Sequence, residues 1–218
     1  MIRGDAFQKV IYAVQFVILL TALIAPAPVH AIADIEVPMP TLEQFAHDVI
    51  NRDPDELRGL YIPGVLADAI VDQPEGMPAY VSSEDGVLTR FELTEGFGSY
   101  GLLAHNTLAG NDFSELEEGQ RIYLVFGDGT TEIFVVMHLL RYQALTPSSV
   151  TSDFVELETG DHFSASELFL KVYDRPGQVI LQTCIDAEGD ASWGRMFIIA
   201  VPLSEYDAHA MPENSVSH

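Results

Sequence analysis

The stretch VILQTC (179–184) is a run of β-forming residues that ends at the only cysteine of the chain. An acidic, glycine-containing segment (185–194) follows it, and then a second apolar run, RMFIIAV (195–201). Short runs rich in β-branched and aromatic residues, bounded by turn-forming residues, are typical of strands. We therefore predict a strand, a loop and a strand. If the two strands pair as neighbours, Cys184 and Arg195 lie side by side at one end of the sheet.

The same pattern is present from about Leu60 onward, where short apolar runs alternate with clusters of Gly, Pro, Asp and Ser. Gly127-Asp128-Gly129 is a hairpin signal between two of these runs. Many short strands favour a closed or nearly closed barrel, because closure removes exposed strand edges. The predicted fold is mostly β, with short helices. The predicted strands are 86–92, 101–105, 121–126, 131–140, 168–173, 178–184 and 195–201.

The N-terminal residues predict export. Arg3 and Lys9 precede an apolar run (10–25), and small residues at Val29 and Ala31 suit cleavage after Ala31, a pattern typical of a secretory signal peptide. If it is not cleaved, the same segment predicts a membrane anchor. We therefore expect residues 1–31 to direct the protein out of the cytoplasm, as a secreted or N-terminally anchored chain.

Residues 32–56 predict an extension that contains an amphipathic helix. Thr41 occupies the capping position, and Gln44 completes a capping box. An apolar stripe follows at helical spacing, and the helix is expected to end near Asp53-Pro54. The rest of the chain is divided into one β-rich domain (57–204) and a polar, loose tail (205–218). The stripe consists of Leu42, Phe45, Ala46, Val49 and Ile50.

The charge balance excludes some functions. The chain has 33 Asp and Glu against 10 Lys and Arg, a formal net charge of −23. A surface this acidic disfavours binding to nucleic acid, since that binding depends on basic residues that contact phosphates. Attraction to an anionic lipid surface is disfavoured for the same reason.

A lone cysteine in an exported chain has two interpretations. Exported proteins usually use their cysteines in disulfides, and one cysteine cannot form an internal pair. Cys184 is therefore either a small buried residue or a retained nucleophile.

A reactive thiol also needs a group that manages protons, and histidine is the usual one. His105 ends the strand 101–105 before a polar loop, which is a rim position. Strand alternation places His138 on the face of Phe134 and Val136, which predicts a structural role. Five of the seven histidines lie in the leader, the helix, an acidic loop or the tail: His30, His47, His162, His209 and His218.

Three segments resemble the sortases, a family of exported cysteine transpeptidases. ILQTC (180–184) is similar to the family's Thr-Leu-x-Thr-Cys motif, with Ile180 in place of the first threonine. AHN (104–106) resembles the catalytic histidine segment, and Arg195 opens a strand after the cysteine as the family's arginine does. A fainter likeness to the first strands of a sortase barrel runs from 61–63 to 72–74. The resemblance covers about residues 57–203 and implies a sortase-like β-barrel.

The resemblance implies a mechanism. Cys184 attacks the Thr carbonyl of a C-terminal sorting signal, typically Leu-Pro-x-Thr-Gly, of another secreted protein. Arg195 stabilises the oxyanion, and His105 protonates the leaving amine. An amine of the cell wall or of a pilin then opens the thioester. The long interval between His105 and Cys184 implies an insertion at 140–168, beside the substrate groove of the family.

The resemblance implies no required cofactor, although some sortases are stimulated by calcium. Carboxylates near the expected groove are hard ligands of the kind that calcium prefers, but a solvated acidic loop is the simpler interpretation. We therefore assign no metal ligand. These carboxylates are Glu115, Glu117, Glu118, Asp153, Glu156, Glu158 and Asp161.

Other functions remain open at the level of sequence. A secreted β-barrel binding module with a buried, incidental Cys184 is the alternative from a different class. An L,D-transpeptidase should carry Ser-x-Gly-Cys followed by Arg, whereas here Thr183 precedes the cysteine. Papain-like hydrolases place the cysteine before the histidine, which is the reverse of the order in this chain.

Overall fold

The computed structural model describes residues 38–149 and 151–210. The predicted signal peptide lies outside these ranges, and so do the last residues of the predicted tail. None of the helices in the described ranges combines the length and the apolar character needed to cross a bilayer. The elements below all belong to the unit that begins at Met39.

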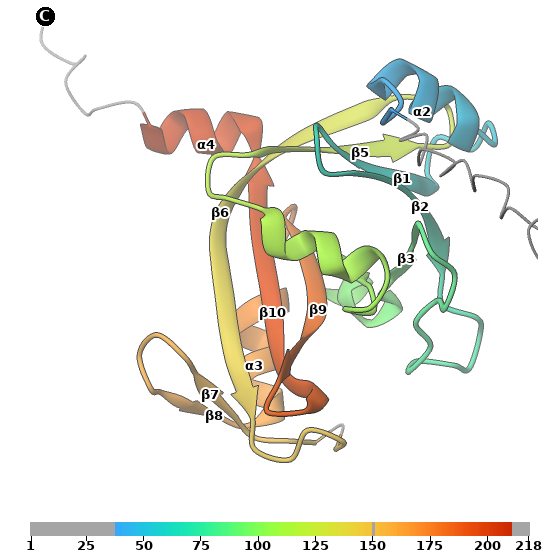
Figure 1. Ribbon diagram of the computed structural model, residues 1–218. Helices are drawn as coiled ribbons and strands as arrows, with labels where there is room; N and C mark the ends of the chain where they lie inside the picture. The colour runs from blue at the N-terminus through green and yellow to red at the C-terminus, as the bar shows by residue number, and fades with distance from the viewer. Residues whose placement is uncertain (1–37, 150, 211–218) are drawn as a thin grey trace, which may run out of the picture. The chain divides into compact units, whose positions relative to one another are not determined.

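Eight strands of the described chain form a closed barrel (Figure 1). Around the barrel the order is β10-β9-β4-β3-β2-β1-β5-β6, and β6 pairs with β10 to close it. The β2–β3 and β4–β9 pairs are parallel and the others are antiparallel. The prediction of a mostly β, closed barrel is confirmed. The strands are β1 (Leu57–Ile62), β2 (Leu66–Asp72), β3 (Val87–Arg90), β4 (Tyr100–Leu103), β5 (Arg121–Phe126), β6 (Thr131–Ala144), β9 (Val179–Ala187) and β10 (Asp190–Pro202).

The core of the barrel is built from alternate residues of its strands. Each strand contributes at least one fully buried aliphatic side chain to one cluster. Burial of a Leu, Ile or Val side chain contributes about 1.5–3 kcal/mol, so the closed interior is the main source of stability. The contributing residues, in strand order, include Leu60, Ile70, Leu88, Leu102, Leu124, Val136, Leu181 and Ile198.

The predicted N-terminal helix is present as α2 (Leu42–Val49). Thr41 and Gln44 form the predicted capping box, and Phe45 and Ala46 are buried. Phe45 packs where Gly59 leaves space, since a Cβ on Gly59 would lie 2.6 Å from the Phe45 ring. The helix ends earlier than predicted, because Ile50 already has extended backbone (ψ 132°).

The predicted strand at 168–173 is wrong, because these residues belong to helix α3 (Ala165–Tyr173). Ser164 caps the helix and forms a capping box with Glu167. Leu168, Val172 and Tyr173 are buried at helical spacing in a second cluster, on the outer side of β6, β9 and β10. The helix therefore covers the outer face of the sheet next to Cys184.

The predicted insertion forms two short strands, β7 (Phe154–Glu156) and β8 (His162–Phe163), that extend from β6. Glu156 is buried there and accepts a hydrogen bond from the Tyr142 hydroxyl at 3.1 Å. Lys171 of α3 lies 3.4 Å from Glu156 and 4.5 Å over the Phe163 ring. Burial and the Glu156 carboxylate raise the pKa of Tyr142, so its hydroxyl keeps the proton that it donates. This cluster fixes α3 to the barrel.

Three further short helices complete the described chain. The 3-10 helix η1 (Glu92–Phe97) precedes β4, and η2 (Ala109–Glu115) follows it. Helix α4 (Leu203–Ala210) packs against β6 and β10, so the first part of the predicted loose tail is helical. The domain boundaries drawn from the sequence remain predictions.

Candidate active site

Cys184 and Arg195 are direct partners in the β9–β10 ladder. Directly opposed residues of antiparallel strands project to the same face, so the two side chains are neighbours, as predicted. The predicted loop at 185–194 is a hairpin instead: the strands continue to Ala187 and from Asp190, and a turn at Glu188-Gly189 joins them. Both turn residues have positive φ, 55° and 80°. The register of the hairpin shifts between Asp190 and Gly194, and beyond this shift Cys184 pairs with Arg195.

His105 follows the end of a third strand. In the parallel β4–β9 ladder Leu103 is paired with Gln182, and Ala104 N–H donates to the Gln182 carbonyl at 3.1 Å. Strand β4 ends at Leu103, two residues before the predicted end of this strand, and His105 lies in the turn that follows it. Strands β9 and β10 thus carry Cys184 and Arg195 as a pair, and His105 follows the end of β4, the other neighbour of β9.

The backbone at His105 is fixed and its side chain is exposed. The His105 carbonyl accepts hydrogen bonds from Leu108 N–H and Gly110 N–H, both at 3.0 Å. These bonds turn the chain from β4 into η2. Gly110 is required at this turn, because a Cβ there would lie 2.8 Å from the His105 carbonyl oxygen.

The Arg195 guanidinium is held by backbone carbonyls. Its Nη1 donates to Ser192 O at 2.9 Å and to Gly194 O at 2.8 Å, and its Nη2 lies 3.4 Å from Pro147 O. The hairpin and the β6–β7 connection therefore both orient it. A half-buried guanidinium fixed beside a thiol supplies N–H donors for an oxyanion.

An apolar groove of about 470 Å³ lies on the side of the sheet that α3 covers. Aromatic rings line it, among them Phe91 and Tyr173 in edge-to-face contact with centroids 5.5 Å apart. The Tyr173 hydroxyl donates to Gln182, and burial raises the pKa of this tyrosine. Among its lining residues, which all belong to the described chain, Arg195 alone is charged. The lining comprises Pro78, Ala79, Phe91, Leu103, Ser149, Phe154, Ala165, Leu168, Phe169, Tyr173, Gln182, Arg195 and Phe197.

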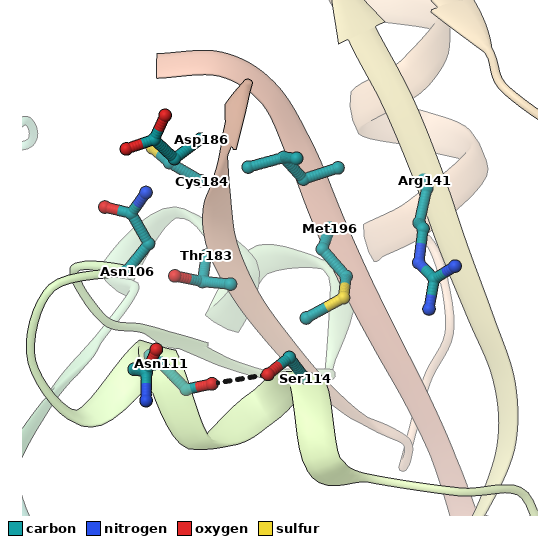
Figure 2. A pocket seen from close by; sticks show the side chains of 10 residues that line it. Asn106, Asn111, Ser114, Arg141, Thr183, Cys184, Asp186 and Met196 are labelled. Atoms are coloured by element: carbon teal, nitrogen blue, oxygen red, sulfur yellow. Dashed lines mark hydrogen bonds between the residues drawn. The ribbon is translucent and has the colours of Figure 1, made fainter. Parts of the chain in front are cut away.

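A polar hollow of about 290 Å³ lies beside η2, and Cys184 is part of its lining (Figure 2). Asn106, which also lines it, donates from Nδ2 to Ala191 O at 3.0 Å and ties the His105 turn to the β9–β10 hairpin. Thr183 is only 3% exposed, and its Oγ1 has no hydrogen-bond partner among the described residues. The lining comprises Asn106, Gly110, Asn111, Ser114, Arg141, Thr183, Cys184, Ile185, Asp186 and Met196.

Strand alternation explains why one strand pair borders both spaces. Gln182 and Arg195 belong to one face of β9–β10, whereas Thr183 and Met196, which are paired with each other, belong to the opposite face. Cys184 lines the hollow, and its partner Arg195 lines the groove. The apolar groove and the polar hollow therefore adjoin at the Cys184–Arg195 pair.

The structural role predicted for His138 is wrong. His138 is exposed, because β6 bulges between Val136 and His138: Ala200 pairs with Val136, and Ile199 pairs with His138. The extra residue shifts the alternation by one, so His138 does not share the face of Phe134 and Val136.

The described residues contain no cluster of three or more His, Cys, Asp or Glu side chains that could hold a metal ion. Of the carboxylates considered for calcium, Glu156 is buried and bound to Tyr142 and Lys171. Sequence reasoning did not find Gln182, Thr183 or Asp186 as part of the site. These three residues lie within two positions of Cys184 in the sequence, and that closeness is the signal that could have identified them.

No family model matches the chain, and no curated protein matches it. Solved structures to which it is similar include sortase C-1 from Actinomyces oris, with a TM-score of 0.46, 15% identity, and coverage of 78% of this chain and 84% of that one. For sortase C1 from Streptococcus suis the values are 0.46, 13%, 81% and 82%. For Listeria monocytogenes sortase A they are 0.42, 13%, 69% and 88%. At these identities and TM-scores, function has to be inferred from the residues of this chain.

Proposed function

We propose that this chain is a sortase-type cysteine transpeptidase in which Cys184 is the nucleophile. The observation that carries the proposal is the Cys184–Arg195 pair of the β9–β10 ladder, with His105 in the turn that follows the neighbouring strand β4. These residue types supply a proton carrier, a nucleophile and an oxyanion donor, which are the parts that acyl transfer through a thioester requires. The LQTC segment (181–184) that ends at this pair supports the same assignment.

In the proposed reaction, the Cys184 thiolate attacks a peptide carbonyl of the acyl donor. Arg195 stabilises the negative charge that develops on the carbonyl oxygen. His105 gives a proton to the leaving amine, and the acyl group remains on sulfur as a thioester. An incoming amine then attacks the thioester and releases the thiolate. These steps need no metal or organic cofactor.

The proposed acyl donor is a C-terminal sorting signal of a secreted protein, similar to Leu-Pro-x-Thr-Gly. The apolar groove suits such a donor, because Leu and Pro side chains bury favourably against aromatic rings. The proposed acceptor is an amine of the cell wall or of a pilin. The N-terminal leader supports an extracytoplasmic location, either secreted or anchored.

The proposal is tested by following the mass of the protein and of the products. The purified chain is incubated with a Leu-Pro-x-Thr-Gly peptide, with and without triglycine. We expect a thioester on Cys184 and faster transfer to triglycine than to water. If a panel of sorting-type peptides leaves the wild-type thiol unlabelled, the transpeptidase proposal fails. An unreactive Cys184 would instead support the binding-module alternative.

A further inference from the structure

The connection between β2 and β3, residues 73–86, supplies part of the apolar groove, and we call it the crossover. Because β2 and β3 are parallel neighbours, the chain between them has to return to the starting end of the sheet. Such connections usually contain a helix, but residues 73–86, all described by the structure, contain neither helix nor strand. Pro78 and Ala79 of the crossover line the groove. Secondary structure therefore does not fix this part of the lining, which we call the crossover wall.

The crossover also buries little of its own surface near the groove. Residues 74–79 are all exposed, and Met77 is 52% exposed. A segment with few buried contacts has low local stability. Two turn bonds, from Met77 N–H to Pro74 O and from Tyr80 N–H to Met77 O, both at 2.9 Å, join residues within the crossover. These two bonds do not attach it to the barrel.

The Gln73 side chain makes that attachment. Gln73 directly follows β2 and is only 7% exposed. Its Nε2 donates to Pro78 O and to Tyr80 O, both at 2.9 Å. Its Oε1 accepts from Glu92 N–H, the first residue of η1, at 3.1 Å. Both the nitrogen and the oxygen of this buried amide are thus used, and they link the crossover to η1.

The η1 end of this link leads to another part of the groove. Phe91 directly precedes η1 and lines the groove. Its N–H donates to Gly101 O of β4 at 2.9 Å, and its ring contacts the Tyr173 ring of α3 edge to face. Phe91 is therefore fixed to the barrel and to α3. Because Gln73 binds on both sides, it fixes how far the crossover wall lies from Phe91.

From these contacts we propose that Gln73 is a positioning residue that fixes the crossover wall and thereby limits the size of the donor side chain that the groove accepts. The inference rests on the proposed transpeptidase function, in which this groove binds the acyl donor. A fixed wall disfavours a side chain larger than the space, because the extra atoms have to displace packed neighbours. Gln73 does not line the groove, so it acts through Pro78 and Ala79.

The link itself is tested in the wild-type protein by hydrogen exchange. The side-chain amide protons of Gln73 should exchange with solvent at least about tenfold more slowly than those of Gln44, because a buried, hydrogen-bonded group exchanges only when the structure opens locally. Gln44 is the reference because it is exposed. NMR of isotope-labelled protein measures both rates. Equal exchange at Gln73 and Gln44 would overturn the link.

Binding of two donor peptides tests the effect on specificity. A Leu-Pro-x-Thr-Gly peptide, and the same peptide with tryptophan in place of leucine, are titrated into isotope-labelled Cys184→Ala, in which no acyl transfer follows. If that variant does not fold, the wild-type thiol is blocked by methylthiolation instead. The leucine peptide should bind about tenfold more tightly than the tryptophan peptide, since overpacking a fixed space is costly. A ratio near one would overturn the proposal.

Gln73→Met, added to the same background, should remove most of this preference. Methionine keeps the length of the side chain and removes all three hydrogen bonds. The crossover wall can then yield to the larger side chain, so the ratio of the two dissociation constants should fall to about threefold or less. A general loss of stability would not change this ratio. The same ratio with and without Gln73→Met would overturn the proposal.

Gln73→Glu separates the two sides of the link and replaces Gln73→Met if the latter does not fold. At neutral pH the carboxylate can still accept from Glu92 N–H, but it cannot donate to Pro78 O or Tyr80 O. Gln73→Glu should therefore lower the ratio as Gln73→Met does. An unchanged ratio in folded Gln73→Glu would show that the bonds to the crossover do not set the wall, and would overturn the proposal.

Thr89→Val is the matched control at the other end of the crossover. Thr89 is fully buried, and its Oγ1 accepts from Ser82 N–H at 2.8 Å; neither residue lines the groove. The variant should lose stability, because a crossover N–H loses its partner, and it should keep the wild-type ratio of dissociation constants. An equal fall of the ratio in Thr89→Val would show a general loosening and overturn the role of Gln73.

These binding measurements need no catalysis, so they separate the inference from the proposed function. If Gln73 sets the ratio as expected but no sorting peptide labels the wild-type thiol, the proposed function fails while the role of Gln73 in the groove remains. If sorting peptides label Cys184 and the ratio is independent of Gln73, the proposed function stands and the inference fails. Failure of both peptides to bind at millimolar concentration would refute the inference.

Discussion

The apolar groove and the polar hollow border the same strand pair, yet aromatic rings line only the groove. The groove is walled by aromatic and aliphatic side chains from α3 and β4, with Arg195 as the charged residue of its described lining. The hollow is walled by amides, hydroxyls, Asp186 and Arg141. Gln182 of β9 lines the groove, whereas the next four residues, 183–186, line the hollow. Cys184 lines the hollow, and its ladder partner Arg195 lines the groove, so the two spaces adjoin at this pair.

The largest expected effect comes from the residue at that junction. Cys184→Ala should fold and should form neither thioester nor product, because only sulfur can carry the acyl group. His105→Ala should fold and react poorly, since the leaving amine loses its proton donor. Mass analysis of adducts and products measures both. His138→Ala is the matched control: His138 is exposed, so this variant should keep wild-type activity and change stability by less than about 0.5 kcal/mol.

Substitution of Arg195 should break the donor half of the reaction and leave the acceptor half intact. Arg195→Ala should lower the rate of thioester formation about a hundredfold or more, because an oxyanion donor is lost. Arg195→Lys should recover little, since an ammonium cannot reproduce the planar fork. Single-turnover kinetics measures this rate, with circular dichroism as a check on folding. Wild-type thioester formation in Arg195→Ala would assign the role to another residue, with Arg175 and Arg121 next to test.

A crossed pair of variants sharpens the comparison between the two spaces. Phe169→Ala removes an aromatic wall of the groove and should raise the KM for the donor peptide about tenfold, with little change for the acceptor. Thr183→Val removes the unpaired hydroxyl while keeping the shape, so it should leave the folded state as stable or more stable. Donor kinetics measures the first effect and thermal unfolding the second. A clear loss of stability in Thr183→Val would contradict the unpaired state of the hydroxyl.

The smallest expected effect is a pH dependence of stability at Asp68 of β2. Burial, followed by the Asp112 and Asp85 charges, raises the pKa of Asp68 to about 6. A raised carboxyl pKa means that the folded state holds its proton more tightly, so stability falls as the pH rises from about 4 to 6. Asp68→Asn should therefore stabilise the protein by about 1 kcal/mol at pH 7, after allowance for solvent screening, and have no effect near pH 4. Thermal unfolding at both pH values measures it; an equal gain at pH 4 would contradict the electrostatic cause.

The sequence predicted the barrel well because its strands are short, apolar and separated by turn residues. Strand β5 has the predicted bounds, 121–126. The run 168–173 was misassigned, because its apolar residues suit a strand as well as a helix, and the capping box at Ser164 and Glu167 was the deciding signal. The bulge that exposes His138 depends on pairing with β10 and leaves no local trace.

The candidate site was partly predictable for a related reason. The Cys184–Arg195 pairing follows from a local hairpin, which strand periodicity reveals. The position of the turn that contains His105 depends on parallel pairing of β4 with β9, which are far apart in the sequence. The polar hollow depends further on where η2 packs against β9. The burial of Ala109 and Phe113 of η2 in the core fixes where this helix packs.

The Lys171–Glu156 contact has a consequence for an enzyme that would transfer acyl groups to amines. Lys171 is the only lysine after Lys9, and its ammonium lies against the Glu156 carboxylate and the Phe163 ring. Both contacts hold the ammonium against the protein surface, and they would have to break before its nitrogen reached an acyl group on another copy. An acylated copy of such an enzyme offers other copies no readily reactive lysine. The acyl group is thereby kept for foreign acceptors, and the enzyme population does not modify itself.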